Sequence, residues 1–251
     1  MNKQNIAVVT GGSGFVGSAI CSHLAKLNFI DRILILDIKK PAKRLDQKID
    51  YLEMDLSDEG LGDVLHSHLE NSNAEVSTLV HCAAFYGEME GWDCPFEKES
   101  RRAWEKVFSV NTFSLFFLIQ KLMGFQPAHQ RLSLVNISSY YGSKAPNPAL
   151  YQDLEMTNVC SYGASKAASD QIVRWINGMF GQKVRGNSIA LGGVSRGQAP
   201  RFLERYNATV PAARMAVEDE VGALVAFLAD PARSDYIAGQ TIYLDGGKSV
   251  W

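Results

Sequence analysis

The sequence predicts an α/β fold in which helices cover both faces of a mostly parallel, seven-stranded sheet. Short apolar runs recur along the chain, and most are separated by segments long enough for a helix. A glycine-rich segment follows the first of these runs directly. The chain has 251 residues, 46% of them hydrophobic, which is enough for one large core. We therefore expect a single domain over residues 1–251, doubly wound around its sheet.

Seven segments are the expected strands. Six of them are apolar runs typical of buried strands, whereas the third is shorter and more polar. Helix-length segments between them favour right-handed crossovers and hence parallel neighbours. In chain order the expected strands are residues 6–9, 33–36, 50–54, 78–81, 132–137, 184–190 and 241–244.

The segment after the first strand has the glycine spacing of a dinucleotide-binding loop. Gly11 suits a tight turn, Gly14 removes a Cβ that would hold a phosphate away, and Gly17 lets the following helix lie close to the sheet. Such a turn can bring backbone N–H groups against a pyrophosphate at the helix N-terminus. A Rossmann-like fold is therefore expected, and the residues of this loop that we expect to bind the cofactor are Gly11, Ser13, Gly14, Phe15, Val16 and Gly17.

Asp37 closes the second apolar run, about 20 residues beyond the last glycine, where an acid that binds the adenosine ribose is expected. Its carboxylate would accept hydrogen bonds from both ribose hydroxyls, whereas a 2′-phosphate would meet a like charge, with no arginine in the glycine loop to compensate. NAD(H) is therefore favoured over NADP(H). Lys39 and Lys40 keep the second cofactor open, although a solvated turn also explains them.

Tyr162 and Lys166 stand four residues apart in a helix-compatible run that extends to about residue 180, so both side chains share one helical face. A neighbouring ammonium favours the phenolate, which predicts that the Tyr162 pKa falls from its reference value near 10. Tyr162 is thus a candidate general acid or base. Ser139 ends a buried-type strand at the carboxyl edge of the sheet, where its hydroxyl can hold a substrate carbonyl oxygen. There are two alternatives to this catalytic interpretation. The spacing of Tyr162 and Lys166 arises by chance, or Ser138 and Ser139 only terminate the strand or cap the following segment.

Motifs along the whole chain form a known set: the loop at residues 10–17, Asp37, Asp55, Asn111, the Asn-Ile-Ser-Ser segment at 136–139, Tyr162 with Lys166, and Asp245-Gly246-Gly247. Together they resemble the short-chain dehydrogenase/reductase family, mostly its small single-domain branch. The resemblance implies that Tyr162 is the catalytic acid/base, that Lys166 lowers its pKa and binds the nicotinamide ribose, that Ser139 polarises the substrate oxygen, and that Asn111 helps to hold a water-linked proton relay. It also implies cofactor contacts by Asp55, Leu56, Cys82, Ala83, Ala84, Tyr162, Lys166, Leu191, Gly192 and Val194.

Several segments depart from the pattern of that branch. The glycine spacing and the run His81-Cys82-Ala83-Ala84 resemble the extended branch of the family, and Leu191 replaces the usual proline before Gly192. The stretch between Ser139 and Tyr162 is longer than is usual in the family. This insertion resembles that of relatives encoded with bacterial surface-sugar or flagellin-modification pathways. We expect residues 195–211 to form a flap that selects the substrate, and an insertion at 86–100 to shape the same pocket through Tyr86, Trp92 and Phe96.

Composition excludes several other classes of function. The formal net charge of −2 comes without a dense basic stripe, and no apolar stretch is long enough for a bilayer, so we expect neither nucleic acid nor a membrane as partner. The sequence shows no secretory signal pattern and its four cysteines are scattered, which favours a cytoplasmic protein without disulfides or a metal site. Apolar helices at 111–125 and 162–180 favour a homodimer or homotetramer.

Three hypotheses follow for the function. The first is an NAD(H)-dependent oxidoreductase that interconverts a secondary alcohol and a ketone of a small molecule, with sugars or polyols as the candidate class. The alternative is a sugar-nucleotide epimerase or dehydratase with tightly bound NAD, which purified protein carrying stoichiometric NAD would favour. A non-catalytic dinucleotide sensor is the third, and the presence of Ser139, Tyr162, Lys166 and Asn111 speaks against it.

Overall fold

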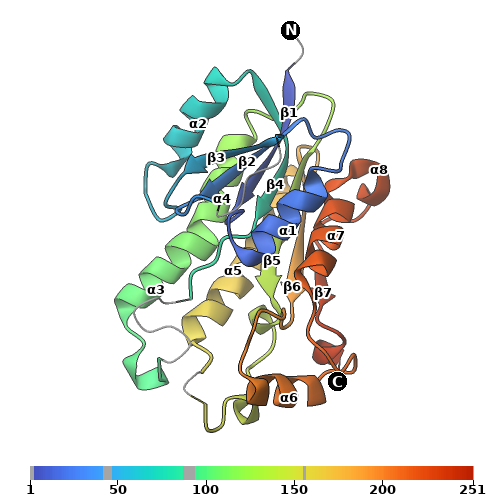
Figure 1. Ribbon diagram of the computed structural model, residues 1–251. Helices are drawn as coiled ribbons and strands as arrows, with labels where there is room; N and C mark the ends of the chain where they lie inside the picture. The colour runs from blue at the N-terminus through green and yellow to red at the C-terminus, as the bar shows by residue number, and fades with distance from the viewer. Residues whose placement is uncertain (1–2, 42–46, 87–93, 155–156, 251) are drawn as a thin grey trace.

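The computed structural model describes residues 3–41, 47–86, 94–154 and 157–250. Seven strands form one sheet in the order β3-β2-β1-β4-β5-β6-β7 (Figure 1). Every pairing is parallel, as the alternation of strand and helix predicted. The strands are β1 (Gln4–Thr10), β2 (Arg32–Asp37), β3 (Ile49–Glu53), β4 (Ala74–His81), β5 (Leu132–Ser139), β6 (Val184–Leu191) and β7 (Thr241–Leu244). Each predicted strand is confirmed; only the third is displaced, by one residue.

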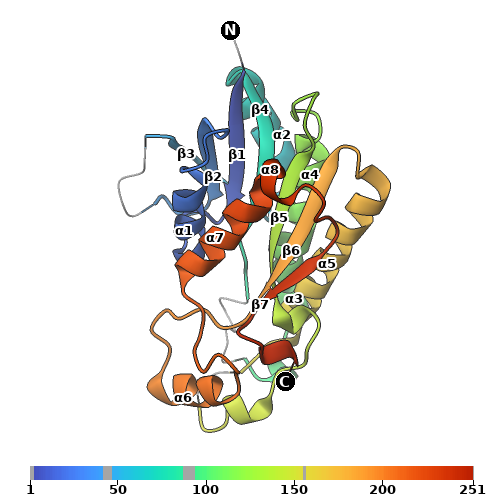
Figure 2. The same cartoon turned by 90° about the vertical axis from the view of Figure 1, so that its right-hand side faces the viewer.

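Helices cover both faces of the sheet, as Figure 2 shows in a view turned by 90°. Helices α1 and α7 pack on one face, and α2, α4 and α5 pack on the other. The helices are α1 (Phe15–Leu24), α2 (Leu61–Asn71), α3 (Arg101–Phe108), α4 (Ser114–Leu122), α5 (Cys160–Phe180), α6 (Pro200–Ala208), α7 (Glu218–Ala229) and α8 (Pro231–Ser234).

Strands β1 and β2 are buried on both sides, which explains their continuous apolar runs. In β1, Ile6 and Val8 enter the core beneath α2 and α4, whereas Ala7 and Val9 enter the core beneath α1 and α7. Successive side chains of a strand point to opposite faces, so both faces of β1 are apolar, whereas polar side chains buried in β5 and β6, such as Asn136 and Arg185, are hydrogen-bonded. The doubly wound, Rossmann-like fold is confirmed.

The strand order reverses between β1 and β4, which are neighbours in the sheet although β2 and β3 intervene in the chain. In open α/β sheets ligands bind outside the carboxyl ends of the strands at such a switch point. The glycine loop follows β1 at this edge, and the segment beginning at Cys82 follows β4 beside it.

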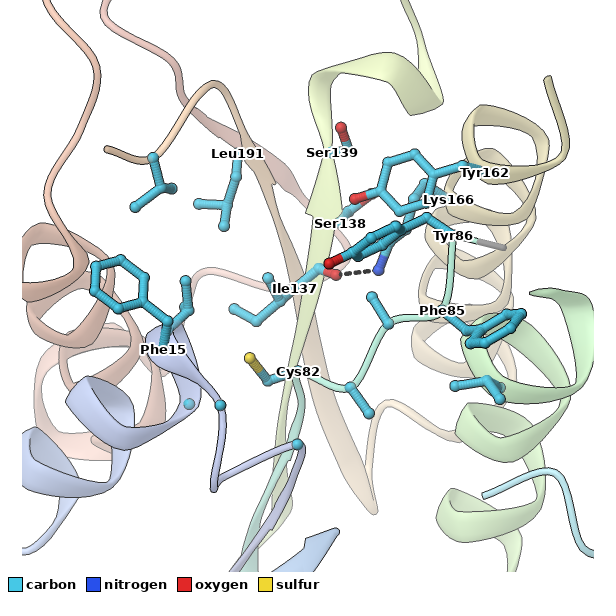
Figure 3. Close-up of a pocket in the computed structure, with 18 of the residues that line it drawn as sticks. Phe15, Cys82, Phe85, Tyr86, Ile137, Ser138, Ser139, Tyr162, Lys166 and Leu191 are labelled. Atoms are coloured by element: carbon cyan, nitrogen blue, oxygen red, sulfur yellow. Dashed lines mark hydrogen bonds between the residues drawn. The ribbon is translucent and has the colours of Figure 1, made fainter. Parts of the chain in front are cut away.

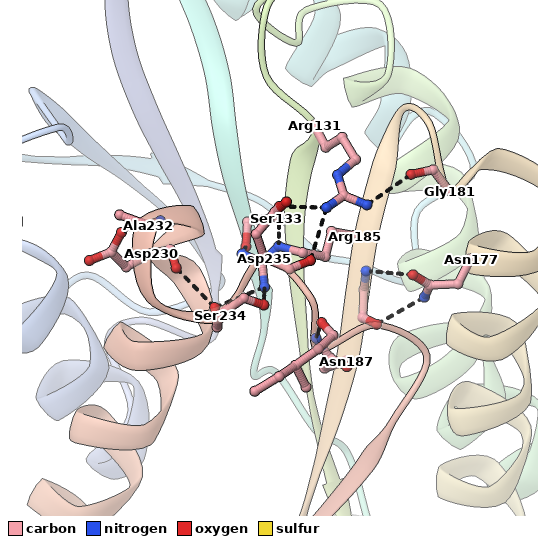
Figure 4. Close-up of polar contacts among 12 residues, drawn as sticks. Arg131, Ser133, Asn177, Gly181, Arg185, Asn187, Asp230, Ala232, Ser234 and Asp235 are labelled. Atoms are coloured by element: carbon pink, nitrogen blue, oxygen red, sulfur yellow. Dashed lines mark hydrogen bonds and ion pairs between the residues drawn. The ribbon is translucent and has the colours of Figure 1, made fainter.

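At the end of the sheet remote from the glycine loop, a buried arginine connects several elements (Figure 4). Arg185, near the start of β6, is 1% exposed, and its guanidinium donates to Ser133 Oγ at 2.7 Å, to the Leu228 carbonyl at 2.7 Å and to the Ser234 carbonyl at 3.1 Å. A charge can be buried at tolerable cost only when its donors are used in this way. The contacts join β5, β6, α7 and α8 at the end of the sheet remote from the glycine loop, so we assign Arg185 to the fold.

Two further observations concern the fold as a whole. Among the described residues, no helix combines the length and the apolar character that crossing a membrane requires.

The predicted apolar helix near 111–125 is composite: a π-helical turn, Ser109–Phe113, precedes α4. Leu115 and Leu118 of α4 are fully buried, whereas Phe113 and Phe117 are 52% and 48% exposed, so only one face of the helix reaches the core.

Candidate active site

A cavity of about 720 Å³ lies at the carboxyl edge of the sheet. The glycine loop, the ends of β2, β4, β5 and β6, the start of α5, and α6 all contribute to its lining. Figure 3 shows the part formed by Phe15, Cys82, Ser139, Leu191 and the start of α5. Of the residues predicted to form the site, those that line this cavity are Gly11, Gly14, Phe15, Val16, Gly17, Asp37, Asp55, Leu56, Cys82, Ala83, Ala84, Ser139, Tyr162, Lys166, Leu191, Gly192 and Val194. The two that do not line it are Ser13 and Asn111.

The glycine loop is shaped by two close backbone approaches. Gly11 has a φ of +67°, which favours glycine, and a Cβ at Gly17 would lie 2.1 Å from the Gly11 carbonyl oxygen. Helix α1 can therefore begin immediately against the turn. Gly14 at its N-cap supplies no side-chain cap, which leaves the first amide groups of the helix suited to an anion such as a pyrophosphate.

Asp37 is oriented by the same loop. Its Oδ2 accepts a hydrogen bond from the Ser13 N–H at 3.0 Å, and its Oδ1 accepts one from the Lys39 N–H at 3.0 Å. Each carboxylate oxygen can accept a further hydrogen bond, since each has more than one acceptor position. Ser13 therefore acts through Asp37 and not as part of the cavity wall. The loop and the carboxylate together fit a nicotinamide dinucleotide.

The predicted catalytic side chains converge at the other end of the cavity. Ser139 ends β5, and Tyr162 and Lys166 share one face of the first two turns of α5. Lys166 Nζ donates to the Ile137 carbonyl at 2.8 Å and lies 5.7 Å from the centroid of the Tyr162 ring (Figure 3). Tyr86 packs edge-on against Tyr162, with 6.2 Å between the ring centroids.

Comparison with known proteins decides the family. Residues 25–249 match the model of a protein family described as enoyl-(acyl carrier protein) reductase. The chain belongs to the short-chain dehydrogenase/reductase family. It is accordingly an oxidoreductase of a family that binds nicotinamide cofactors.

Three similar proteins illustrate the range of this short-chain dehydrogenase/reductase family. The rhamnolipids biosynthesis 3-oxoacyl-[acyl-carrier-protein] reductase of Pseudomonas aeruginosa is 30% identical, over 96% of this chain and 95% of its own length. Among solved structures, a short chain dehydrogenase from Leptospira borgpetersenii with bound NAD+ gives a TM-score of 0.85 at 23% identity, covering 98% of this chain and 93% of that chain. The aldohexose dehydrogenase of Thermoplasma acidophilum gives 0.81 at 22% identity, covering 99% and 95%.

The ionisation of this short-chain dehydrogenase/reductase site differs from the expectation. Burial raises the pKa of Tyr162 to about 12, although a hydrogen bond with Ser139 and the charge of Arg196 lower it in part. Burial also lowers the pKa of Lys166 to about 8. The prediction that the ammonium brings the Tyr162 pKa below 10 is therefore wrong for this structure. Lys166 lies over the ring and donates to a backbone carbonyl, and burial disfavours the charged form of both groups.

Asn111 does not line the cavity, and its side chain makes contacts within the protein. It is fully buried in the π-helical turn; its Oδ1 accepts from the Phe85 N–H at 2.7 Å, and its Nδ2 donates to the Phe85 carbonyl at 2.9 Å and to Ser165 Oγ at 3.0 Å. These contacts connect the segment after β4 to α5 beside Lys166. Asn111 is therefore placed to position other residues, since its amide is used in protein contacts and does not reach the cavity.

Sequence reasoning missed most of the side chains at the catalytic end of the cavity. They are largely aromatic and come from the long stretch after β5 and from the expected flap: Tyr140, Tyr141, Tyr151, Arg196, Gln198, Phe202, Tyr206 and Met215. The position of these segments was a signal, but no spacing rule identifies which of their residues face inward. Tyr86 lines the cavity as expected, Phe96 is 80% exposed and does not line it, and Trp92 lies outside the described residues.

Lys166 should make the stability of the enzyme depend on pH. Its folded pKa of about 8 lies below the ordinary 10.5, so between these values the unfolded chain binds more protons and stability rises with pH. Below pH 8 the cost of the buried charge, about 3 kcal/mol, is fully present. We expect Lys166→Met to be inactive yet about 2 kcal/mol more stable than wild type at pH 7, because the lost hydrogen bond costs about 1 kcal/mol.

Urea unfolding of both proteins at pH 7, 8, 9 and 10 measures this difference. The gap in the free energy of unfolding should narrow as pH rises, since wild-type Lys166 loses its charge within the fold. A gap that stays constant or widens over this range contradicts the argument.

Proposed function

We propose that the protein is an NAD(H)-dependent oxidoreductase that interconverts a secondary alcohol and a ketone, with Tyr162 as the acid/base. One observation carries the proposal: the cavity has the glycine loop and Asp37 at one end and Ser139, Tyr162 and Lys166 at the other. A dinucleotide that spans this cavity places its reactive ring beside a phenol and a serine hydroxyl. That pairing is the minimum required for hydride transfer coupled to proton transfer.

The chain's own residues have distinct tasks in this reaction. Bound cofactor supplies the hydride donor or acceptor. Ser139 Oγ donates a hydrogen bond to the substrate carbonyl oxygen. During reduction the Tyr162 hydroxyl gives that oxygen a proton and becomes a phenolate, and during oxidation the Tyr162 phenolate accepts the proton of the substrate hydroxyl. Because burial raises the Tyr162 pKa to about 12, the phenol keeps its proton at neutral pH and is ready to act as the acid. Asn111 holds α5 against the segment after β4 and so keeps Tyr162 and Lys166 in place.

Sugars and polyols are the substrate class that we favour. The catalytic end of the cavity is lined by several tyrosine hydroxyls, which can hydrogen-bond the hydroxyls of such a substrate. The structural likeness to the aldohexose dehydrogenase supports this choice. None of the three proteins compared above is an epimerase or a dehydratase, and we do not propose that activity.

A titration with both reduced cofactors tests the cofactor assignment. We expect NADH to bind at least about tenfold more tightly than NADPH, because a 2′-phosphate would meet the Asp37 carboxylate. Asp37→Ser should remove most of this preference, and the fluorescence of the reduced nicotinamide measures both constants. Tighter binding of NADPH to the wild type would overturn the assignment.

A separate assay tests the reaction itself. Sugars and polyols are incubated with the protein and NAD, and the absorbance of the reduced nicotinamide measures their oxidation.

We also propose a homodimer or homotetramer. Helices α4 and α5 both present apolar side chains to solvent, namely Phe113 just before α4, Phe117, Trp175, Met179 and Phe180. Exposed apolar surface of this kind is typical of interfaces between subunits. Light scattering of the purified protein measures its mass, and a monomer at micromolar concentration would contradict the proposal.

A further inference from the structure

We propose that Arg196 binds a carboxylate of the substrate beside the reacting carbon, so that the enzyme prefers hydroxy acids of the sugar type to neutral polyols. This inference rests on the proposed function, which it deepens. It depends on the distribution of charge in the cavity, on the way the loop carrying Arg196 is held, and on the groups that surround its guanidinium.

The two ends of the cavity differ in charge. The charged residues that line it, within the described part of the chain, are Asp37, Lys39, Asp55, Lys106, Lys166 and Arg196. Asp37 is bonded to the glycine loop, and Asp55 pairs with Lys106 at 3.2 Å. The catalytic end therefore has Lys166 and Arg196 as its charged lining residues, and no described carboxylate lines it there. A substrate anion at this end would meet two cationic side chains, of which Arg196 is exposed to solvent.

The loop that presents Arg196 is held on both sides by hydrogen bonds. The Ser195 N–H donates to the Ala216 carbonyl at 2.9 Å, and the Arg196 N–H donates to Gln198 Oε1 at 2.9 Å. Gln198 Nε2 in turn donates to the Val194 carbonyl at 2.7 Å. The backbone is thus arranged before any ligand binds, which reduces the entropy lost on binding.

The guanidinium of Arg196 differs from those of its neighbours in the flap. Arg201 and Arg205 both pair with Asp153, at 3.2 and 3.6 Å. Arg196 makes no ion pair with any described residue and lines the cavity instead. Arg196 and Tyr162 line the same cavity, and the Arg196 charge acts on the Tyr162 phenol.

The remaining groups at this end suit the hydroxyls of the same molecule. Tyr140, Tyr141 and Tyr151 line the cavity, and the hydroxyls of Tyr141 and Tyr151 are hydrogen-bonded at 2.5 Å. Burial raises the pKa of all three, so they remain neutral. Because Tyr141 and Tyr151 share a hydrogen bond, one of these two hydroxyls uses its proton within the protein, and its oxygen can still accept a hydrogen bond from a substrate hydroxyl. A planar guanidinium matches a carboxylate in a two-point contact, and the phenols complete the recognition of a polyhydroxy acid.

Calorimetric titration of the NADH-saturated protein tests the proposal with matched pairs of ligands. Each pair is an aldonate of four to six carbons and the alditol of the same length, which differ only in the carboxylate. We expect at least one aldonate to bind about tenfold more tightly than its alditol. Arg196→Gln should remove this difference, Arg196→Lys should retain part of it, and Arg201→Gln, the matched control, should leave it unchanged.

Each other outcome overturns the proposal. If no aldonate in the series binds the wild type better than its alditol, Arg196 does not select a carboxylate. If Arg196→Gln weakens the binding of NADH and not that of the aldonate, the guanidinium binds the cofactor's diphosphate. If the wild type binds the corresponding sugar phosphates more tightly than aldonates, the guanidinium binds a phosphate group. Failure of the proposed function is seen separately, as an aldonate that binds in this Arg196-dependent way but is not oxidised with NAD.

Discussion

Replacement of Tyr162 by phenylalanine is expected to lower kcat about a thousandfold, the order of magnitude that a positioned acid/base contributes. The substitution removes only the hydroxyl. The ring keeps its edge-on contact with Tyr86 and its position beneath the Lys166 ammonium. The fold and the NADH affinity should therefore remain close to wild type, and the loss should appear in kcat.

The measurement combines kcat with the dissociation constant of NADH and the melting temperature. Tyr86→Phe is the matched control, because it removes a phenol from the same cavity at a ring that touches Tyr162. We expect its kcat to fall far less. Full turnover by Tyr162→Phe on an identified substrate would remove the proposed chemistry.

Replacement of Gly17 by alanine is expected to weaken NADH binding at least about a hundredfold. The new Cβ would lie 2.1 Å from the Gly11 carbonyl oxygen and 2.8 Å from the Gly12 Cα, and both are backbone atoms that no rotamer change can remove. The loop must move away from α1, which displaces the amide groups that face the pyrophosphate. Loss of one or two amide hydrogen bonds to the charged pyrophosphate, at about 1.5–3 kcal/mol each, raises the dissociation constant of NADH by about two orders of magnitude.

NADH fluorescence titration measures the effect, with circular dichroism to establish the folded fraction. Gly60→Ala is the control, since a Cβ there meets nothing within 4 Å and Gly60 does not line the cavity. NADH binding by a folded Gly17→Ala protein at wild-type strength would show that this loop does not hold the cofactor.

The structure shows why some residues of the site were predictable. Gly11, Gly17 and Asp37 act through local geometry: a turn, a helix start and the end of a strand, each within a few residues of its cause. Tyr162 and Lys166 share a face because four residues make about one helical turn. The side-chain contacts of Asn111 were not predictable, because its partners Phe85 and Ser165 are 26 and 54 residues away. Nothing in the local pattern shows whether an amide faces the cavity or the interior.

The sequence by itself determined the seven strands and their parallel pairing, and it predicted the residues of the cofactor end of the site. Both features were predictable because the apolar run of a buried strand and the glycines of a tight turn are set by residues that are close in the sequence. Only the tertiary structure decided the proton affinity of Tyr162. It also decided which further residues join Ser139, Tyr162 and Lys166 at the catalytic end of the cavity, where β5, the start of α5 and the Arg196 loop meet. A pKa depends on burial, and burial depends on segments far apart in the chain that only folding brings together.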